Sequence, residues 1–189
     1  MATSESSAAR QQILDIASQL FYQKGTQNVG INEVIAQAGV AKRTLYRHFP
    51  SKDDLIVEVM QHRANRWITW FEEAVNSKGG TAKERLLATF DVLQSWYSEP
   101  YFRGCPFINV VLEIADASHP AHQVSVQLRE QLRTYIMQLA LEAGVNDPIA
   151  FSQQYLLLIG GASLMATIEG NPTGAQFAKQ TLEVLISAS

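Results

Sequence analysis

INEVIAQAGVAKRTLYRHFPSK, residues 31–52, is the stretch that most strongly indicates how this chain folds. Apolar residues recur at helical spacing over residues 31–38. Gly39 is expected to end that helix, because glycine readily adopts the left-handed conformation found at helix ends. A second apolar face begins with Val40 and Leu45 only a few residues later. The pattern predicts two short helices joined by a tight turn, which is a helix-turn-helix.

The second of these helices carries an outer face rich in hydrogen-bond donors. Its members are Lys42, Arg43, Thr44, Tyr46, Arg47 and His48. Such side chains can donate to phosphates and to base edges. A pair of helices in an ordinary bundle with a solvated charged face is the alternative, but the mixture of basic and aromatic residues favours DNA binding. Leu45 and Phe49 are expected to point inward, and Tyr46 has either a core role or a phosphate contact.

Residues 39–55, GVAKRTLYRHFPSKDDL, resemble the DNA-reading segment of the tetracycline-repressor (TetR) family of bacterial transcription regulators. The match is specific over about residues 10–56, and the remainder agrees only in length and helical character. The resemblance implies an all-α fold. The expected fold has an N-terminal three-helix DNA-binding head with a helix-turn-helix, followed by a larger helical ligand-binding and dimerisation domain.

The resemblance also implies roles for single residues. Lys42, Arg43, Thr44, Tyr46 and His48 fall at positions in or beside the major groove, and Lys52 at a position that contacts a backbone phosphate. Arg47, Gly30 and Arg10 complete the expected DNA-binding set, Arg10 being either a phosphate contact or merely solvated. Gly30 and Ala41 depart from the family pattern, which favours Thr or Ser and Ser, respectively. These departures affect individual phosphate contacts and not the fold.

The charge is divided unevenly along the chain. The net charge is −3, but residues 1–52 hold six Lys and Arg against three Asp and Glu, which leaves that part at +3 and the rest at −6. A basic head on an acidic body orients a protein on DNA. We find no nucleophile elbow, glycine-rich phosphate loop or zinc spacing, so we expect neither an enzyme nor a cofactor.

Cysteine and membrane patterns indicate a cytoplasmic protein. The one cysteine, Cys105, excludes an internal disulfide and fits a reducing compartment. It is either a buried small residue or, beside Arg103, a redox sensor. Residues 1–12 have no export signal. The apolar stretch from Tyr155 to Ile168 is expected to be too short to span a membrane.

Four residues in one part of the chain are possible metal ligands. Glu113, Asp116, His119 and His122 stand three apart, but Pro120 interrupts any shared helix face. Exposed loop residues explain the set equally well, and no metal is expected.

The domain division expected from these patterns places a disordered tail at residues 1–6. The helix-turn-helix DNA-binding domain follows at residues 7–52, and the ligand-binding and dimerisation domain at residues 53–189. Beyond the head, helices are expected at about 53–75, after the capping box of Thr81 and Glu84, from Pro106 to about 117, and at 121–143, 148–169 and 174–186. No strand pattern is found.

A homodimer is expected, because one short helix reads too few base pairs and a two-fold dimer reads a palindrome. The two long helices at 121–143 and 148–169 are the expected interface. The candidate residues are Leu128, Leu132, Tyr135, Leu139, Gly160, Gly161 and Leu164. Packing within one chain is the other role for the same residues, and the two roles are compatible.

A set of eight aromatic residues and one methionine forms either plain core or the lining of an apolar pocket. Its members are Trp67, Trp70, Phe71, Phe90, Trp96, Tyr97, Phe102, Phe107 and Met137. A pocket with so few charges favours a small apolar or aromatic ligand. The sequence therefore predicts a regulator, with double-stranded DNA carrying a palindromic operator as its partner and ligand-induced release. The alternative is a helical small-molecule-binding or scaffold protein with a degenerate DNA head.

Overall fold

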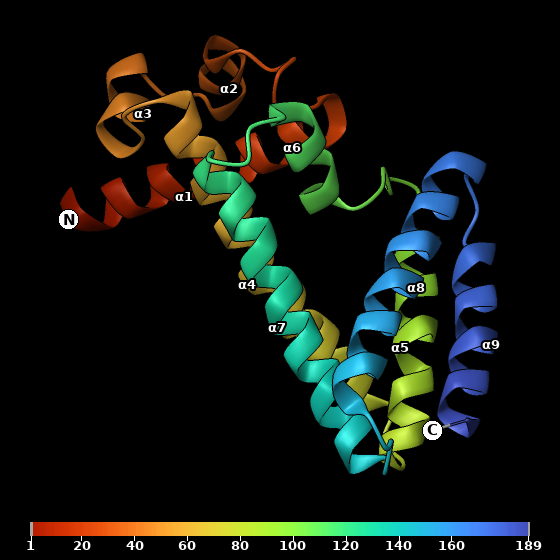
Figure 1. The fold of residues 1–189 in the computed structure, drawn as a ribbon. Coiled ribbons are helices and arrows are strands. Elements are labelled where there is room, and N and C mark those ends of the chain that lie inside the picture. The colour runs from red at the N-terminus through yellow and green to blue at the C-terminus, as the bar shows by residue number, and fades with distance from the viewer. Residues whose placement is uncertain (1, 189) are drawn as a thin grey trace. The chain divides into compact units, whose positions relative to one another are not determined.

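A computed structural model describes residues 2–188, with side chains from Ser7 onward (Figure 1). These residues form helices joined by turns and contain no strand, as the predicted all-α class requires. The helices are α1 (Ala2–Lys24), α2 (Ile31–Ala38), α3 (Lys42–His48), α4 (Lys52–Ser77), α5 (Ala82–Tyr97), α6 (Pro106–Ile114), α7 (Pro120–Glu142), α8 (Pro148–Glu169) and α9 (Thr173–Ser187).

The predicted helix signals act where they were expected. Gly39 ends α2 with a φ of 61°, and the Thr81 and Glu84 side chains form a reciprocal capping box at the start of α5. Pro106 is the first residue of α6. The start of α1 differs from the expectation of a tail over residues 1–6, because the helix is described from Ala2; Met1 lies outside the described residues.

The chain divides into two compact units, each built from two segments. The N-terminal unit comprises the residues up to Asn65 together with Pro106–Val126. The C-terminal unit comprises Arg66–Cys105 and the residues from Gln127 onward. Helix α6 therefore packs in the N-terminal unit, although the 40 residues Arg66–Cys105 of the other unit separate it from the first segment of the N-terminal unit.

The core of the N-terminal unit holds the two short helices in place. Ile13 and Leu20 of α1, Val34 of α2 and Leu45 of α3 are buried, as is Phe49 immediately after α3. Figure 1 shows α2 and α3 next to α1. Because α3 has only seven residues, these few contacts, and not intrinsic helix stability, maintain its conformation.

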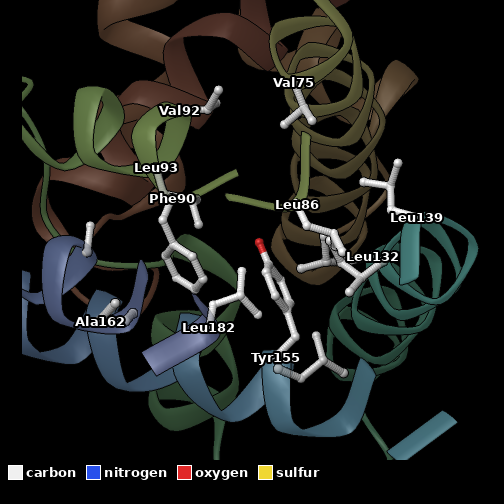
Figure 2. Packing of buried hydrophobic residues seen from close by; sticks show 14 of the residues in the cluster. Val75, Leu86, Phe90, Val92, Leu93, Leu132, Leu139, Tyr155, Ala162 and Leu182 are labelled. Carbon is white, nitrogen blue, oxygen red and sulfur yellow. The ribbon is translucent and has the colours of Figure 1, made fainter. Parts of the chain in front are cut away.

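The core of the C-terminal unit lies between α5, α8 and α9, with further residues from α4 and α7. Phe90 and Tyr155 face each other at a ring-centroid distance of 5.3 Å, with Leu182 beside them (Figure 2). Tyr155 is fully buried, and this burial raises the pKa of its phenol well above the ordinary value.

Helix α8 runs from Pro148 to Glu169 and is therefore longer than the apolar stretch considered in the sequence. By length and composition it is the one helix among the described residues that is able to cross a membrane. A core helix of a soluble bundle passes the same test, and α8 buries Tyr155, Leu156, Ala162 and Ala166 inside its unit.

Candidate nucleic-acid interface

The turn between α2 and α3 is fixed by backbone hydrogen bonds. The N–H of Gly39 donates to Ala36 O, and the N–H of Val40 donates to Ile35 O, both at 3.3 Å. These two hydrogen bonds satisfy carbonyl groups at the end of α2 and direct the chain into α3. At the other end of α3, the N–H of Phe49 donates to Leu45 O at 2.9 Å.

Four of the predicted DNA-contacting side chains on α3 are exposed: Lys42, Arg43, Tyr46 and Arg47. The exposed fraction of Tyr46 is 39%, so of its two possible roles the core role is excluded. Its ring lies 5.9 Å from Lys42 Nζ, a cation–π distance. Thr44 is half-buried. The exposed face therefore combines three cations with a phenol on a helix that is held by Leu45.

The remaining predicted contacts have individual surroundings. Arg10 pairs with Glu58 at 2.7 Å, and its guanidinium lies 5.3 Å from the centre of the Phe49 ring, so it links α1 to α4 in the N-terminal unit. Its side chain is still 41% exposed, so the phosphate contact stays a prediction. Lys52 is half-buried at the first position of α4, close in sequence to α3. Gly30 is the exposed N-cap of α2.

His48 differs from the other residues of this face. Its Nε2 atom is buried and makes no hydrogen bond within the described residues. Burial, and then the positive charges of Arg47 and Arg10, lower the pKa of its imidazole below the ordinary value of 6.5. His48 is thus half-buried and favours the neutral form at the end of α3.

We expect protonation of His48 to destabilise the fold. Its pKa is lower in the folded than in the unfolded chain, so the free energy of unfolding falls as the pH drops through 6.5 toward the folded-state pKa. NMR titration of the His48 ring should give a pKa below 6.5. His48→Gln should weaken the dependence of stability on pH over this range. A His48 pKa at or above 6.5 would contradict the expectation.

Neither N-cap of the helix-turn-helix uses its side chain. Gly30 and Ala41 have extended N-cap backbones without a side-chain hydrogen bond. We expect Ala41→Ser to raise the free energy of unfolding by about 1 kcal/mol, because a serine hydroxyl can accept from a free N–H of the first turn of α3. Urea unfolding checks this, with Ala41→Val as the control without a cap. An equal gain in both variants would count against capping.

Six members of the predicted pocket set form one aromatic cluster in the C-terminal unit: Trp67, Trp70, Phe71, Trp96, Tyr97 and Phe102. The ring of Trp67 stacks on Phe71 at 5.0 Å and touches Trp96 at 5.8 Å. Phe102 extends the cluster by packing at 5.3 Å from the Trp96 ring. Trp67 Nε1 is buried without a hydrogen-bond partner among the described residues.

The other three members lie elsewhere. Phe90 packs on Tyr155 in the core, and Phe107 belongs to the N-terminal unit. Met137 lies on α7, with its sulfur 4.0 Å from a nitrogen of Arg133. The sequence could not separate these residues, because aromatic spacing on a helix does not distinguish between two buried environments.

The predicted dimer residues separate into two groups. Leu128, Leu132 and Leu139 of α7 are buried within their own chain, and Tyr135 donates a hydrogen bond to Asn76 at 3.3 Å. These four therefore have partners within the chain, and a role for them in the dimer stays a prediction. On α8, Gly161 and Leu164 are exposed, and a Cβ atom added to Gly160 or Gly161 would meet no atom within 4 Å.

Further exposed apolar residues accompany Gly161 and Leu164, and the sequence analysis missed them. They are Leu157 and Ile168 on α8 and Phe177 and Val184 on α9. A spacing of four and seven residues connects Leu157, Gly161, Leu164 and Ile168, so they share one face of α8. That spacing was the signal available in the sequence.

Glu113, one of the residues considered as metal ligands, makes hydrogen bonds within the chain. Glu113 accepts hydrogen bonds from Thr26 at 2.6 Å. Over the described residues, no three His, Cys, Asp or Glu side chains are grouped closely enough to hold a metal ion. Cys105 is half-buried immediately before α6.

Comparisons with known proteins agree with this geometry. A family model described as bacterial regulatory proteins of the tetR family matches residues 13–59. A second, described as a Tetracyclin repressor-like C-terminal domain, matches residues 82–182. The HTH-type transcriptional regulator YjdC of Escherichia coli (strain K12) is 23% identical over 152 residues, which is 80% of each chain.

Solved structures extend the likeness to nearly the whole chain. A TetR-family transcriptional regulator of Streptomyces coelicolor has 28% identity and a TM-score of 0.88 over 96% of each chain. A TetR-type transcriptional regulator of Streptomyces avermitilis has 30% identity and a TM-score of 0.84 over 95% of this chain and 97% of that one. The fold and the exposed face of α3 thus define a DNA-binding transcriptional regulator of the helix-turn-helix class. Within that class, the chain belongs to the tetracycline-repressor family, whose members are regulators and not enzymes.

Proposed function

We propose that this protein is a cytoplasmic, homodimeric repressor that binds a palindromic operator and releases it when a small apolar or aromatic ligand binds. In this proposal residues 7–52 bind DNA, and residues 53–189 bind the ligand and form the dimer. The exposed face of α3 supports the operator contact: Lys42, Arg43, Tyr46 and Arg47 are accessible on a helix whose opposite side is buried. Arg43 can pair with guanine through two hydrogen bonds, and such a pair discriminates by roughly 1–3 kcal/mol.

Selection of bound fragments from the source genome tests operator binding. We expect the purified protein to enrich one palindromic sequence, and Arg43→Ala combined with Tyr46→Ala to lose that enrichment. The logarithm of the binding constant should fall with the logarithm of salt, by about 0.9 for each phosphate contact. Equal enrichment by wild type and double variant would contradict the role of Arg43 and Tyr46 in operator binding. No enrichment by wild type would favour the alternative, a helical carrier with a degenerate head.

The exposed faces of α8 and α9 support the homodimer. Leu157, Leu164 and Ile168 have exposed fractions of 71%, 60% and 74%, and Phe177 and Val184 are exposed apolar residues on the neighbouring helix. In Figure 1 the two helices lie side by side. A second copy of the chain is the occupant we propose, because a two-fold axis through this face brings identical apolar residues together and the exposed Gly161 allows close approach.

The aromatic cluster supports an aromatic ligand. It is built from uncharged rings, and the buried N–H of Trp67 is left without an acceptor within the described part of the chain. A buried donor without a partner costs about 1–3 kcal/mol, so a ligand carrying an acceptor oxygen or nitrogen would gain from meeting it.

Tryptophan fluorescence reads this cluster directly. Trp67, Trp70 and Trp96 are the only tryptophans in the sequence, and all three belong to the cluster. We expect an effector compound to change the emission and to lower operator affinity in the same concentration range, since release requires different affinities for two conformations. A compound that releases DNA without altering the emission would place its site elsewhere.

A further inference from the structure

The turn between α1 and α2 is held by a carboxylate from a distant part of the sequence. Oε2 of Glu113, in the last turn of α6, accepts a hydrogen bond from the backbone N–H of Thr26 and another from its hydroxyl, each at 2.6 Å. Thr26 is 4% exposed, whereas Glu113 is an exposed residue, so the two bonds are partly buried. Hydrogen bonds to a charged acceptor are shorter and stronger than neutral ones.

The approach of this carboxylate depends on the residue before Thr26. Gly25 has a φ of 86°, and a Cβ atom at that position would lie 3.0 Å from Glu113 Oε1. Both the left-handed backbone and the close contact favour glycine. Gly25 therefore allows the Glu113 carboxylate to reach the end of α1.

Helix α6 is itself fixed within the N-terminal unit. Val110 is buried, and it lines a small cleft together with Phe21 and Tyr22 of α1 and Met60 of α4. Ala115, the first residue after α6, has a φ of 53°, which is unfavourable for a residue other than glycine. Such strain persists where surrounding contacts over-determine the conformation. Side-chain packing and the Glu113 hydrogen bonds provide those contacts here.

We propose that Glu113 is a positioning residue for operator binding. Through Thr26 it fixes the turn that leads into α2 and α3, and thereby makes α6 a functional part of the DNA-reading unit. Eight residues connect α5 to α6, so a rearrangement of that connection would reach the helix-turn-helix through this carboxylate. The inference rests on the proposed operator binding and adds a residue outside the segment that reads DNA.

The electrostatic effect of removing Glu113 has the opposite sign from the positioning effect. Loss of a negative charge from a DNA-binding unit should tighten binding to DNA or leave it unchanged. We expect Glu113→Ala to weaken operator affinity by about tenfold instead, because two charge-assisted hydrogen bonds are lost. Asp15→Asn is the matched control: Asp15 is exposed on α1 and accepts a hydrogen bond from Gln11 of the same helix.

Fluorescence anisotropy with a labelled duplex of the selected operator measures these effects at fixed salt. Glu113→Gln should bind within about threefold of wild type, since an amide oxygen can still accept from Thr26. Thr26→Ser should retain affinity and Thr26→Val should lose part of it. The double variant Glu113→Ala with Thr26→Val should bind no more weakly than Glu113→Ala alone. The proposal would be overturned if the losses of operator affinity in the two single variants multiplied in the double variant. Wild-type affinity in Glu113→Ala would overturn it as well.

Amide hydrogen exchange in the free protein separates this inference from the proposed function. Exchange at Thr26 and across α2 should be faster in Glu113→Ala than in wild type, and unchanged in Asp15→Asn. A wild type that binds no operator would refute the proposed function alone. Unchanged exchange in Glu113→Ala would refute the positioning role whether or not DNA is bound. The Thr26→Ser and Thr26→Val pair decides the matter if Glu113→Ala fails to fold.

Discussion

Leu164→Glu is expected to convert the proposed dimer into monomers and to abolish tight operator binding. Leu164 is 60% exposed on α8, in line with Leu157, Gly161 and Ile168. In a two-fold dimer the substitution places two carboxylates in one apolar interface, and each unpaired buried charge costs several kcal/mol. We expect the dimer dissociation constant to rise by about 100-fold or more, since every 1.4 kcal/mol is a factor of ten.

Leu141→Glu is the matched control for this experiment. Leu141 is a leucine of α7 with an exposed fraction of 61%, so the chemical change and the exposure are nearly the same. Sedimentation velocity should show monomers for Leu164→Glu and dimers for Leu141→Glu, with operator affinity following the assembly state. A monomeric Leu141→Glu beside a dimeric Leu164→Glu would move the interface from α8 to α7.

Leu45→Ala is expected to unfold the DNA-reading part of the chain and leave the C-terminal unit folded. Leu45 is completely buried, and replacing such a leucine by alanine costs about 2–5 kcal/mol. Helix α3 has seven residues and no side-chain N-cap, so little else maintains it. The C-terminal unit has a separate core around Phe90, Tyr155 and Leu182. Thermal unfolding followed by circular dichroism should therefore show an early transition that wild type lacks.

Leu141→Ala provides the comparison for stability. The same side-chain change at an exposed position should alter the free energy of unfolding by no more than about 0.5 kcal/mol. Operator binding should be lost in Leu45→Ala at temperatures above its early transition and retained in Leu141→Ala. One transition with the wild-type midpoint in Leu45→Ala would contradict the dependence of α3 on Leu45.

The helices themselves were largely predictable because local signals control where they begin and end. Gly39, the Thr81 and Glu84 capping box and Pro106 act at the expected residues. The buried face of α3 was equally predictable, since Leu45 and Phe49 are its apolar residues, while its cations can face outward. At these positions the information lies within one or two helical turns, and sequence and structure agree; the start of α1 is the exception.

The partners of these helices were not predictable in the same way. The apolar residues of α7 and α8 have similar spacing, yet Leu132 packs inside its own chain and Leu164 does not. The ion pair of Arg10 with Glu58, which is 48 residues away, was likewise not foreseen. The partner of each side chain depends on which helices pack together. The periodicity of a single sequence does not contain that information.

The discontinuous N-terminal unit has a consequence for building hybrid regulators. Joining residues 1–52 of this chain to the ligand-binding part of another family member would transfer Thr26 without Glu113, and α1 without the apolar residues of α6 that pack beside it. A functional exchange would have to transplant Pro106–Val126 as well. The module that can be transferred thus consists of two separate segments of the chain. A hybrid with a single junction would contain only one of them.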